Sequence, residues 1–280
     1  MLTIIHSIYN YNPIIKQALN FNVASLEALN IDYQYILFND NGSKENETQI
    51  DPHISNNKNF NYVYSDTNYG FGKALGGWIG AYKLGLVKGE YIHNIAQDDF
   101  FTPAFWNVCV EALAASEKDV GAIFTNCYHV DENFCPLEIP LPLELQSQIQ
   151  WLNPDMTFKY MFNPDDTGAF TCMNNFVYFP GTVYRTNLYE KIGLPDTETY
   201  NGSADYEYWA RMTFNRYKFL YYPYPLWFYM KSAYSHSAIE GGDDRKNIYN
   251  PKIRKKYEYL WKQNNFKLNS QPKITEDIIL

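Results

Sequence analysis

The sequence contains little cysteine, little basic charge and no long apolar run, and each of these shortages excludes a class of protein. Only 4 of the 280 residues are cysteine. None of them has a C-x-x-C spacing, so neither a disulfide-stapled domain nor a zinc module is expected. The 23 basic residues against 31 acidic ones give a net charge of −8, which disfavours a partner that is bound through nucleic-acid phosphates.

Membrane and export signals are also missing from the sequence. No apolar stretch approaches the roughly 18 residues of a membrane span. The first residues lack the basic region of a signal peptide and run directly into a strand pattern. We therefore expect a cytoplasmic protein with no transmembrane segment and with reduced, buried thiols. Cys127, His129 and Cys135 do not match the ligand spacing of a zinc site, although the three could be imagined around a metal.

Aromatic side chains are the feature that the sequence has in excess. They make up 18% of the chain, with 26 tyrosines and 18 phenylalanines, while the hydrophobic share of 46% is ample for a core. Tyrosine combines a flat apolar face with a hydroxyl group, which suits sugar rings as well as protein interiors. The excess of aromatic residues is thus a first indication of a carbohydrate ligand. No feature of the sequence indicates the oligomeric state.

Strand and helix patterns alternate along the first hundred residues. Four β-rich runs are found at 3–8, 35–38, 62–64 and 90–95. A helical pattern at 13–29 lies between the first two runs, and one at 72–86 lies between the last two. This alternation predicts an α/β fold with a doubly wound, mostly parallel sheet of the Rossmann-like type.

The second half of the chain is less regular. A helix is expected from Pro103, a strand at 120–125, and then a proline-rich excursion over 135–166. Later elements are expected at 176–185, 186–191, 202–212 and 221–229, followed by a helix from Asn250. We divide the chain into one domain over 1–230, with halves 1–100 and 101–230, and a C-terminal loop and helix over 231–280 that packs on it.

Polar residues follow several of the predicted parallel strands. Asp40 follows the second strand, Asn68 and Gly70 the third, and Asp98 and Asp99 the fourth. In an open α/β sheet, ligands bind outside the carboxyl ends of the strands, so one crevice could hold all of these groups. Each cluster also has a simpler interpretation, because the first fits a turn and the last fits the cap of the following helix.

The order of these motifs resembles the inverting glycosyltransferases of family 2, which have the GT-A fold. The resemblance extends from the first residue to about Tyr229. The residues that carry it are Tyr9-Asn10, the run 40–43, the run 68–72, Gly89 to Ile92, Asp98-Asp99, Ile192-Gly193, Asp205 and Arg211. It implies transfer of a single sugar from a nucleotide-sugar, most simply a UDP-sugar, to a hydroxyl of a glycan or glycoconjugate. The Gln-x-x-Arg-Trp signature of processive synthases is missing.

The resemblance also implies which residues bind the donor. A carboxylate such as Asp40 can accept a hydrogen bond from the uracil imide, and the main chain near Tyr9 can flank the base. Lys73 is a candidate cation for the phosphates, as are Lys231 and Arg245. The full set expected at the nucleotide-sugar is Tyr9, Asp40, Asn41, Asn68, Gly70, Lys73, Gln97 and Asp98.

A divalent cation is the cofactor implied by the same resemblance. Asp98 and Asp99 occupy the family's Asp-x-Asp position, which holds Mn²⁺ or Mg²⁺ on the diphosphate. His236 could be a third ligand or a phosphate donor, or merely a solvated loop residue. The chain departs from the pattern at Ala96, where the family has its first acid.

Asp205 matches the family's catalytic base, although Ala204 replaces the acid that usually precedes it. Inversion needs one displacement, in which a carboxylate takes the proton of the attacking hydroxyl. Glu207 is the alternative base, two residues further on and on another side of the helix. Arg211 is expected to brace that helix.

Two other functions are compatible with parts of the sequence. A sugar-nucleotide pyrophosphorylase would need a glycine-rich basic loop after the first strand, where this chain has Tyr9 to Pro13. A non-catalytic glycan- or nucleotide-binding protein on a degenerate transferase scaffold is favoured by Ala96 and Ala204. Hydrolysis of the donor in the absence of acceptor would distinguish an enzyme from such a binding protein.

Overall fold

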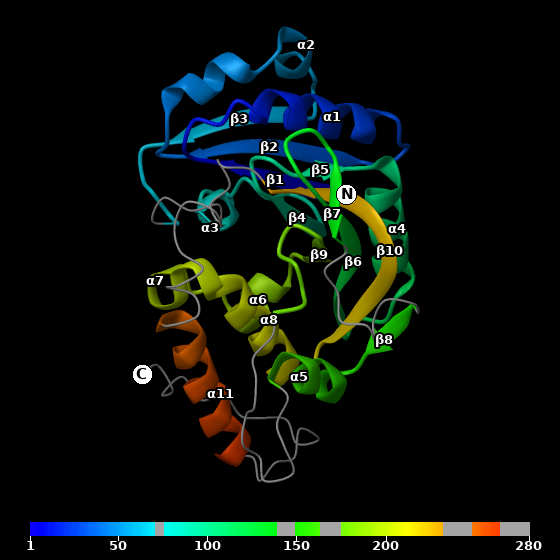
Figure 1. Cartoon of the computed structure of the whole chain (residues 1–280), viewed down its shortest axis with the longest axis vertical. Helices are drawn as coiled ribbons and strands as arrows, with labels where there is room; N and C mark the ends of the chain where they lie inside the picture. The colour runs from blue at the N-terminus through cyan, green and yellow to red at the C-terminus, as the bar shows by residue number, and fades with distance from the viewer. Residues whose placement is uncertain (71–75, 139–148, 163–174, 232–247, 264–280) are drawn as a thin grey trace.

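A computed structural model of the chain describes residues 1–70, 76–138, 149–162, 175–231 and 248–263. A curved sheet runs through the molecule, with helices on both of its faces (Figure 1). The strands are β1 (Leu2–Ile8), β2 (Tyr33–Asp40), β3 (Phe60–Ser65), β4 (Tyr91–Ile95), β5 (Phe100–Phe101), β6 (Val120–Val130), β7 (Pro136–Glu138), β8 (Gln150–Leu152), β9 (Thr182–Arg185) and β10 (Lys218–Met230).

The helices alternate with these strands in the first half and gather in the second. The α-helices are α1 (Ile15–Glu27), α2 (Pro52–Ser55), α3 (Gly76–Lys83), α4 (Pro103–Ala115), α5 (Pro154–Phe162), α6 (Leu188–Ile192), α7 (Thr197–Tyr200), α8 (Ala204–Phe214) and α11 (Asn250–Gln263). Two 3-10 helices of the described chain, η1 (Lys44–Gln49) and η3 (Asn201–Ser203), precede α2 and α8.

The sheet order is β3-β2-β1-β4-β9-β6-β10-β5, with β7 paired to β6 and β8 paired to β10. Strands β3, β2, β1 and β4 are mutually parallel, and β6 is parallel to β10. Strand β9 is antiparallel to both β4 and β6 and therefore joins the two parallel groups. The predicted mostly parallel α/β sheet is confirmed, with antiparallel strands in its second half.

Strands β1 and β2 are buried on both faces, which explains their nearly continuous apolar sequence. Successive side chains point to opposite faces. Ile4 and Leu37 accordingly join the core beneath α1 and α4, whereas Ile5 and Phe38 join the core beneath α3 and α8. The two helical layers are thus fixed by the period-2 pattern of the strands.

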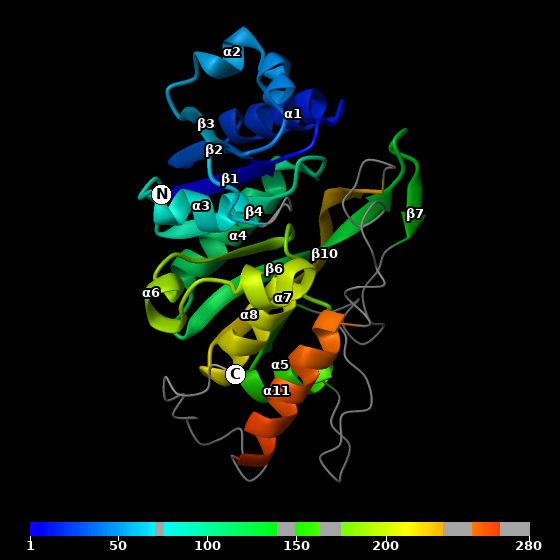
Figure 2. The same ribbon diagram turned by 90° about the vertical axis from the view of Figure 1, so that its left-hand side faces the viewer.

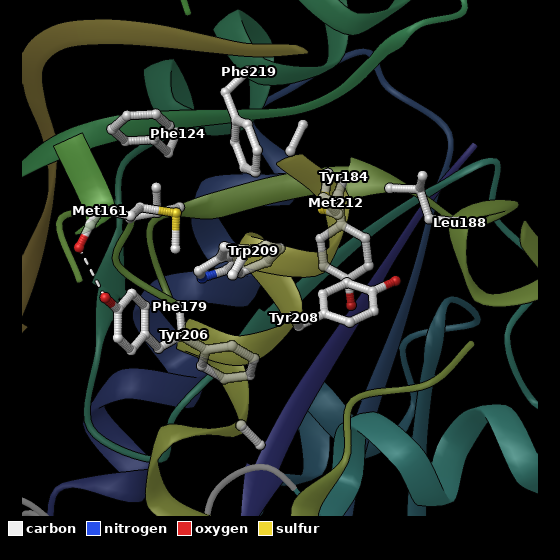
Figure 3. Close-up of a cluster of buried hydrophobic side chains, with 14 of the residues drawn as sticks. Phe124, Met161, Phe179, Tyr184, Leu188, Tyr206, Tyr208, Trp209, Met212 and Phe219 are labelled. Atoms are coloured by element: carbon white, nitrogen blue, oxygen red, sulfur yellow. Dashed lines mark hydrogen bonds between the residues drawn. The ribbon is translucent and has the colours of Figure 1, made fainter. Parts of the chain in front are cut away.

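The second core is largely aromatic and surrounds helix α8. Trp209 and Tyr208 of α8 pack among Phe124, Phe219 and Tyr184, which come from β6, β10 and β9 (Figure 3). The hydroxyl of Tyr206 donates a hydrogen bond of 2.8 Å to the Met161 carbonyl of α5. Much of the aromatic excess therefore belongs to the interior, and the composition alone is not evidence for a sugar ligand.

Helix α11 lies against the end of this core, next to α8 and α5 in both views (Figures 1 and 2). Ile253, Tyr257 and Leu260 are its buried residues, at helical spacing. The Trp261 ring stacks on Phe158 of α5, with centroids 4.4 Å apart. The predicted C-terminal helix is confirmed, and it packs on α5 and α8.

Some predicted elements differ from the structure. The element expected over 176–185 is a strand only in β9, and residues 175–181 form turns and irregular backbone. The excursion contains β7, β8 and α5, which the frequent prolines had obscured. Strand β2 extends to Asp40, two residues further than its apolar run.

Candidate active site

The carboxyl ends of β1, β2 and β4 are joined by hydrogen bonds at one place. The Tyr9 carbonyl accepts a bond of 2.8 Å from the Ser43 backbone N–H and one of 3.0 Å from the Asn46 side chain. The Tyr9 backbone N–H lies 3.5 Å from the Gln97 Oε1 atom. Of the predicted donor residues, Tyr9 and Gln97 therefore lie beside each other.

Glycine is required at Gly42 because the chain makes a close approach there. A Cβ atom at this position would lie 2.1 Å from the Tyr9 carbonyl oxygen. The preceding Asn41 has a φ of 59° and accepts a hydrogen bond from the Tyr64 hydroxyl at 3.2 Å. The run 40–43 is thus a tight turn, as its simpler interpretation predicted, and this turn also forms one wall of the candidate site.

Asp40 ends β2, and its carboxylate is 1% exposed. One carboxylate oxygen accepts the Tyr69 backbone N–H at 2.8 Å, and the other accepts the Gly70 N–H at 3.0 Å. Burial raises the pKa of Asp40, and these two hydrogen bonds oppose the rise. Asp40 therefore orders the loop after β3 and brings predicted donor residues of two strands together.

The same loop is fixed by two further contacts. The Asn68 side chain accepts the Gly70 N–H at 3.1 Å. A Cβ atom at Gly76, the first residue of α3, would lie 1.7 Å from an Asp40 carboxylate oxygen. Only glycine lets α3 begin so close to Asp40. Lys73 lies outside the described residues.

Asp98 and Asp99 follow β4 and are 5% and 1% exposed. Asp99 accepts hydrogen bonds from the backbone of Ala96 and Met230, which connects β4 to the end of β10. Burial raises the pKa of Asp99 well above its ordinary value, and the charge of Asp98 raises it further. The cap interpretation is wrong for Asp99, because the N-cap of α4 is Thr102 and Asp99 bonds elsewhere.

The Asp98-Asp99 pair fits a hard divalent cation in its chemistry. The Oδ2 atom of Asp99 is buried and has no hydrogen-bond partner in the described structure. Carboxylate oxygens are the preferred ligands of Mg²⁺ and Mn²⁺. Within the described residues, no group of three or more histidine, cysteine, aspartate or glutamate side chains could hold a metal. His236 lies outside them, as does Arg245, whereas Lys231 directly follows Met230 of β10.

Asp205 lies in the first turn of α8 and is half-buried. The Asn175 side-chain amide donates a hydrogen bond of 3.1 Å to its Oδ2 atom. Asn175 belongs to an irregular segment, and no sequence pattern singled it out. The preceding helix α7 contacts the loop that Asp40 orders, because the Thr197 hydroxyl lies 3.3 Å from the Tyr69 carbonyl. Helix α7, which precedes the helix of Asp205, therefore lies against the loop that Asp40 orders.

Glu207, the alternative base, is completely buried and forms a structural ion cluster. Its carboxylate lies 2.5 Å from Arg211 and 2.7 Å from the Lys256 Nζ atom of α11. Burial raises the pKa of Glu207, but the two cations outweigh it and leave the pKa below its ordinary value. Arg211 also donates to the Ile192 and Leu194 carbonyls and braces the helix as expected. An acceptor hydroxyl has no access to Glu207.

Comparison with known proteins yields one family and one group of structures. The model of the family described as "Glycosyl transferase family 2" matches residues 3–183. None of the curated proteins compared matches the chain. Among solved structures, residues 1–349 of S. aureus TarS with UDP-GlcNAc share 15% identity, with a TM-score of 0.59 and 92% of this chain covered.

A mannosyltransferase from Pyrobaculum calidifontis, solved with GDP-Man and Mn²⁺, shares 13% identity, with a TM-score of 0.51 over 95% of this chain. The chain spans 66% of the TarS fragment with UDP-GlcNAc and 64% of the mannosyltransferase. The likeness shows that the fold is the GT-A fold. In the described part of the chain, no helix has the length and apolar character needed to cross a membrane.

Proposed function

Because the chain belongs to glycosyl transferase family 2, we propose that it is a non-processive inverting glycosyltransferase that transfers one sugar from a UDP-sugar to a glycan or glycoconjugate hydroxyl. One observation carries this proposal. The buried Asp40 carboxylate binds the backbone of the Tyr69-Gly70 loop, and that loop contacts α7, which leads into the helix of Asp205. Donor-side and acceptor-side residues are thereby held around a single loop.

On the donor side, the turn of Asp40 and the main chain at Tyr9 bind the base. Each Asp40 oxygen accepts one backbone N–H, and each oxygen keeps a second lone pair that can accept another hydrogen bond. The uracil imide N–H supplies that bond. Asn41, Asn68, Gly70 and Gln97 line the remainder of the nucleotide-sugar site, and Lys73 contributes a positive charge to the phosphates.

At the diphosphate, Asp98 and Asp99 hold Mn²⁺ or Mg²⁺, with His236 as a further ligand. The support for a cation is the buried, unsatisfied Oδ2 atom of Asp99 beside a second carboxylate. When bound, the metal neutralises the charge that develops on the departing nucleotide.

On the acceptor side, Asp205 is the general base. The acceptor hydroxyl oxygen attacks the anomeric carbon while the bond from that carbon to the diphosphate oxygen breaks. The proton of the hydroxyl moves to the Asp205 carboxylate, and UDP leaves with the electron pair of the broken bond. A single in-line displacement inverts the anomeric configuration. Asn175 orients the carboxylate through its bond to Oδ2.

The decisive experiment measures nucleotide release from a panel of UDP-glucose, UDP-galactose, UDP-GlcNAc and GDP-mannose, with Mn²⁺ and with EDTA. We expect slow hydrolysis of one UDP-sugar in the absence of acceptor, and a rise in melting temperature with UDP and Mn²⁺, since a ligand of the native state stabilises it. NMR of the product sugar should show an inverted anomeric configuration.

Each failure in this experiment has a distinct meaning. Tight UDP binding with no release from any donor would indicate the non-catalytic binding protein and contradict the enzyme. Nucleotide release at the same rate in EDTA and in Mn²⁺ would be consistent with a transferase but would contradict a role for the metal ion. A product of retained configuration would exclude the single displacement.

A further inference from the structure

The turn that leads into Asp205 has an unusual backbone. Asn201 begins η3 with a φ of 41°, a conformation that residues other than glycine rarely adopt. Such residues persist only where the surrounding structure holds them. In this chain the strained residue lies four positions before the proposed base. The contacts that hold the turn therefore bear on the position of Asp205.

Those contacts come from the start of α11, about fifty residues further along the chain. The Asn201 side-chain amide donates a hydrogen bond of 3.2 Å to the Tyr249 hydroxyl. The Ser203 hydroxyl donates one of 2.9 Å to the Asn250 side-chain oxygen. Ser203 is 3% exposed and is also the N-cap of α8. One end of the three-residue turn is thus bonded to Tyr249, directly before α11, and the other to Asn250, the first residue of α11.

Helix α11 is in turn fixed to α8 by the buried Glu207 cluster. The Lys256 ammonium group lies 2.7 Å from Glu207, and the Tyr257 hydroxyl donates a hydrogen bond of 3.1 Å to the same carboxylate oxygen. Lys256 also lies over the ring of Tyr200, the last residue of α7. Because Glu207 is completely buried, the loss of either partner would leave part of its buried charge uncompensated, which is strongly destabilising. This cluster fixes where α11 lies, and hence where Tyr249 and Asn250 lie.

We propose that Tyr249 and Asn250 are positioning residues that hold the strained 201–203 turn, and through it the Asp205 carboxylate, in the geometry for proton transfer from the acceptor. This inference rests on Asp205 as the base. Both residues contact the turn itself, through Asn201 and Ser203. They lie beyond residues 3–183, so the family match does not include them.

The test uses three α11 variants in the full chain. Tyr249→Phe removes only the hydroxyl that accepts from Asn201, and Asn250→Ala removes the acceptor for Ser203. Asn250→Asp keeps a side-chain oxygen at that place and should restore the contact. Tyr259→Phe is the matched control, because Tyr259 is on the same helix and is 51% exposed.

Hydrogen exchange measured by mass spectrometry reports on the turn without any substrate. Tyr249→Phe and Asn250→Ala should accelerate exchange in a peptide spanning 200–206, whereas Asn250→Asp and Tyr259→Phe should not. Unchanged exchange in both of the first two variants would overturn the positioning role.

Kinetics with the donor that the wild-type protein cleaves then separate positioning from stability. We expect kcat to fall about 10- to 100-fold in Asn250→Ala, the scale of a misplacement of about 1 Å, while the Kd of UDP and the melting temperature stay close to wild type. In an Asp205→Asn background, Asn250→Ala should cause no further loss. If Asn250→Ala lowers kcat by the same factor in the Asp205→Asn protein as in the wild type, the inference is overturned.

The proposed function and this inference fail differently. An Asp205→Asn enzyme with the wild-type rate overturns the base, and the positioning role with it. A large loss in Asp205→Asn together with wild-type kcat in both Tyr249→Phe and Asn250→Ala overturns the positioning role alone.

Discussion

At the scale of single residues, Asp40 connects the sequence motif to the proposed donor site most directly. Its two carboxylate oxygens already accept backbone N–H groups from the loop after β3. Substitution of Asp40 should therefore have two effects, because it removes a contact to the uracil and also frees the loop after β3. We expect Asp40→Ala to weaken UDP binding by about 1.5–3 kcal/mol or more, the value of a hydrogen bond to a charged group.

Isothermal titration calorimetry of UDP checks this expectation. Asp66→Asn is the control, because Asp66 is an exposed acid just after β3. UDP affinity that is equal in Asp40→Ala and in the wild type would remove Asp40 from the nucleotide site.

Asp205 is the proposed general base, so the chemical step should be the one that its substitution slows. Asp205→Asn keeps the shape of the side chain and can still accept from Asn175, but it cannot take a proton. Turnover should therefore fall by about 100- to 10,000-fold, the contribution of a general base, with little change in the Kd of UDP. Steady-state kinetics and calorimetry measure the two quantities. Glu198→Gln, which alters an exposed acid of α7, should keep wild-type turnover.

At the scale of elements, the packing of α8 and α11 depends on one buried carboxylate. Glu207 would have been the natural control for Asp205 on sequence alone, but it is 0% exposed and paired with Arg211 and Lys256. Removing one member of a buried ion cluster leaves the others uncompensated. We expect Glu207→Gln to lower the free energy of unfolding by about 3–5 kcal/mol.

Urea denaturation followed by circular dichroism measures this loss. Glu258→Gln on α11 makes the same chemical change in a pair with Lys262 that is partly exposed to solvent. Such pairs contribute about 0–1 kcal/mol. If both variants lose the same small amount of stability, the buried cluster does not hold α11.

At the scale of the whole molecule, two buried histidines make the stability of the central sheet sensitive to acid. His6 of β1 and His93 of β4 are both 0% exposed. Burial lowers the pKa of His6 to about 4 and that of His93 to about 3. In the unfolded chain each has a pKa of about 6.5, so the unfolded state binds more protons below that pH. Their contribution to stability is complete above pH 6.5 and is lost as the pH falls.

The prediction is best isolated with His93→Gln. In the wild type, His93 should remove about 1.4 kcal/mol of unfolding free energy per pH unit between pH 6 and 4. The variant should lack the His93 share of this slope and keep the share of His6, whatever its stability at neutral pH. The raised pKa values of Asp40 and Asp99 act in the opposite direction, but in both proteins, so they cancel in the comparison. Parallel urea titrations from pH 7 to pH 4 measure the slope, and identical slopes would contradict the prediction.

Local patterns in the sequence were sufficient for the parallel half of the sheet and for the polar turn and loop at its carboxyl edge. The apolar runs of β1 and β2 are buried on both faces, and their period of two assigns each residue to one core. Polar residues after these strands must then meet, because parallel strands end at the same edge. The helix from Asn250 could also be predicted, because the helical spacing of its apolar residues is a local signal.

Contacts between distant segments could be decided only by the tertiary structure. The sequence places Glu207 two residues from Asp205, but it is α11, fifty residues away, that makes Glu207 a buried structural acid. The bond from Asn175 to Asp205 and the ties from Tyr249 and Asn250 to the 201–203 turn likewise join segments with no shared pattern. Periodicity reports which face of an element is buried. The partner that covers that face, and so the role of each polar residue there, is set by long-range packing.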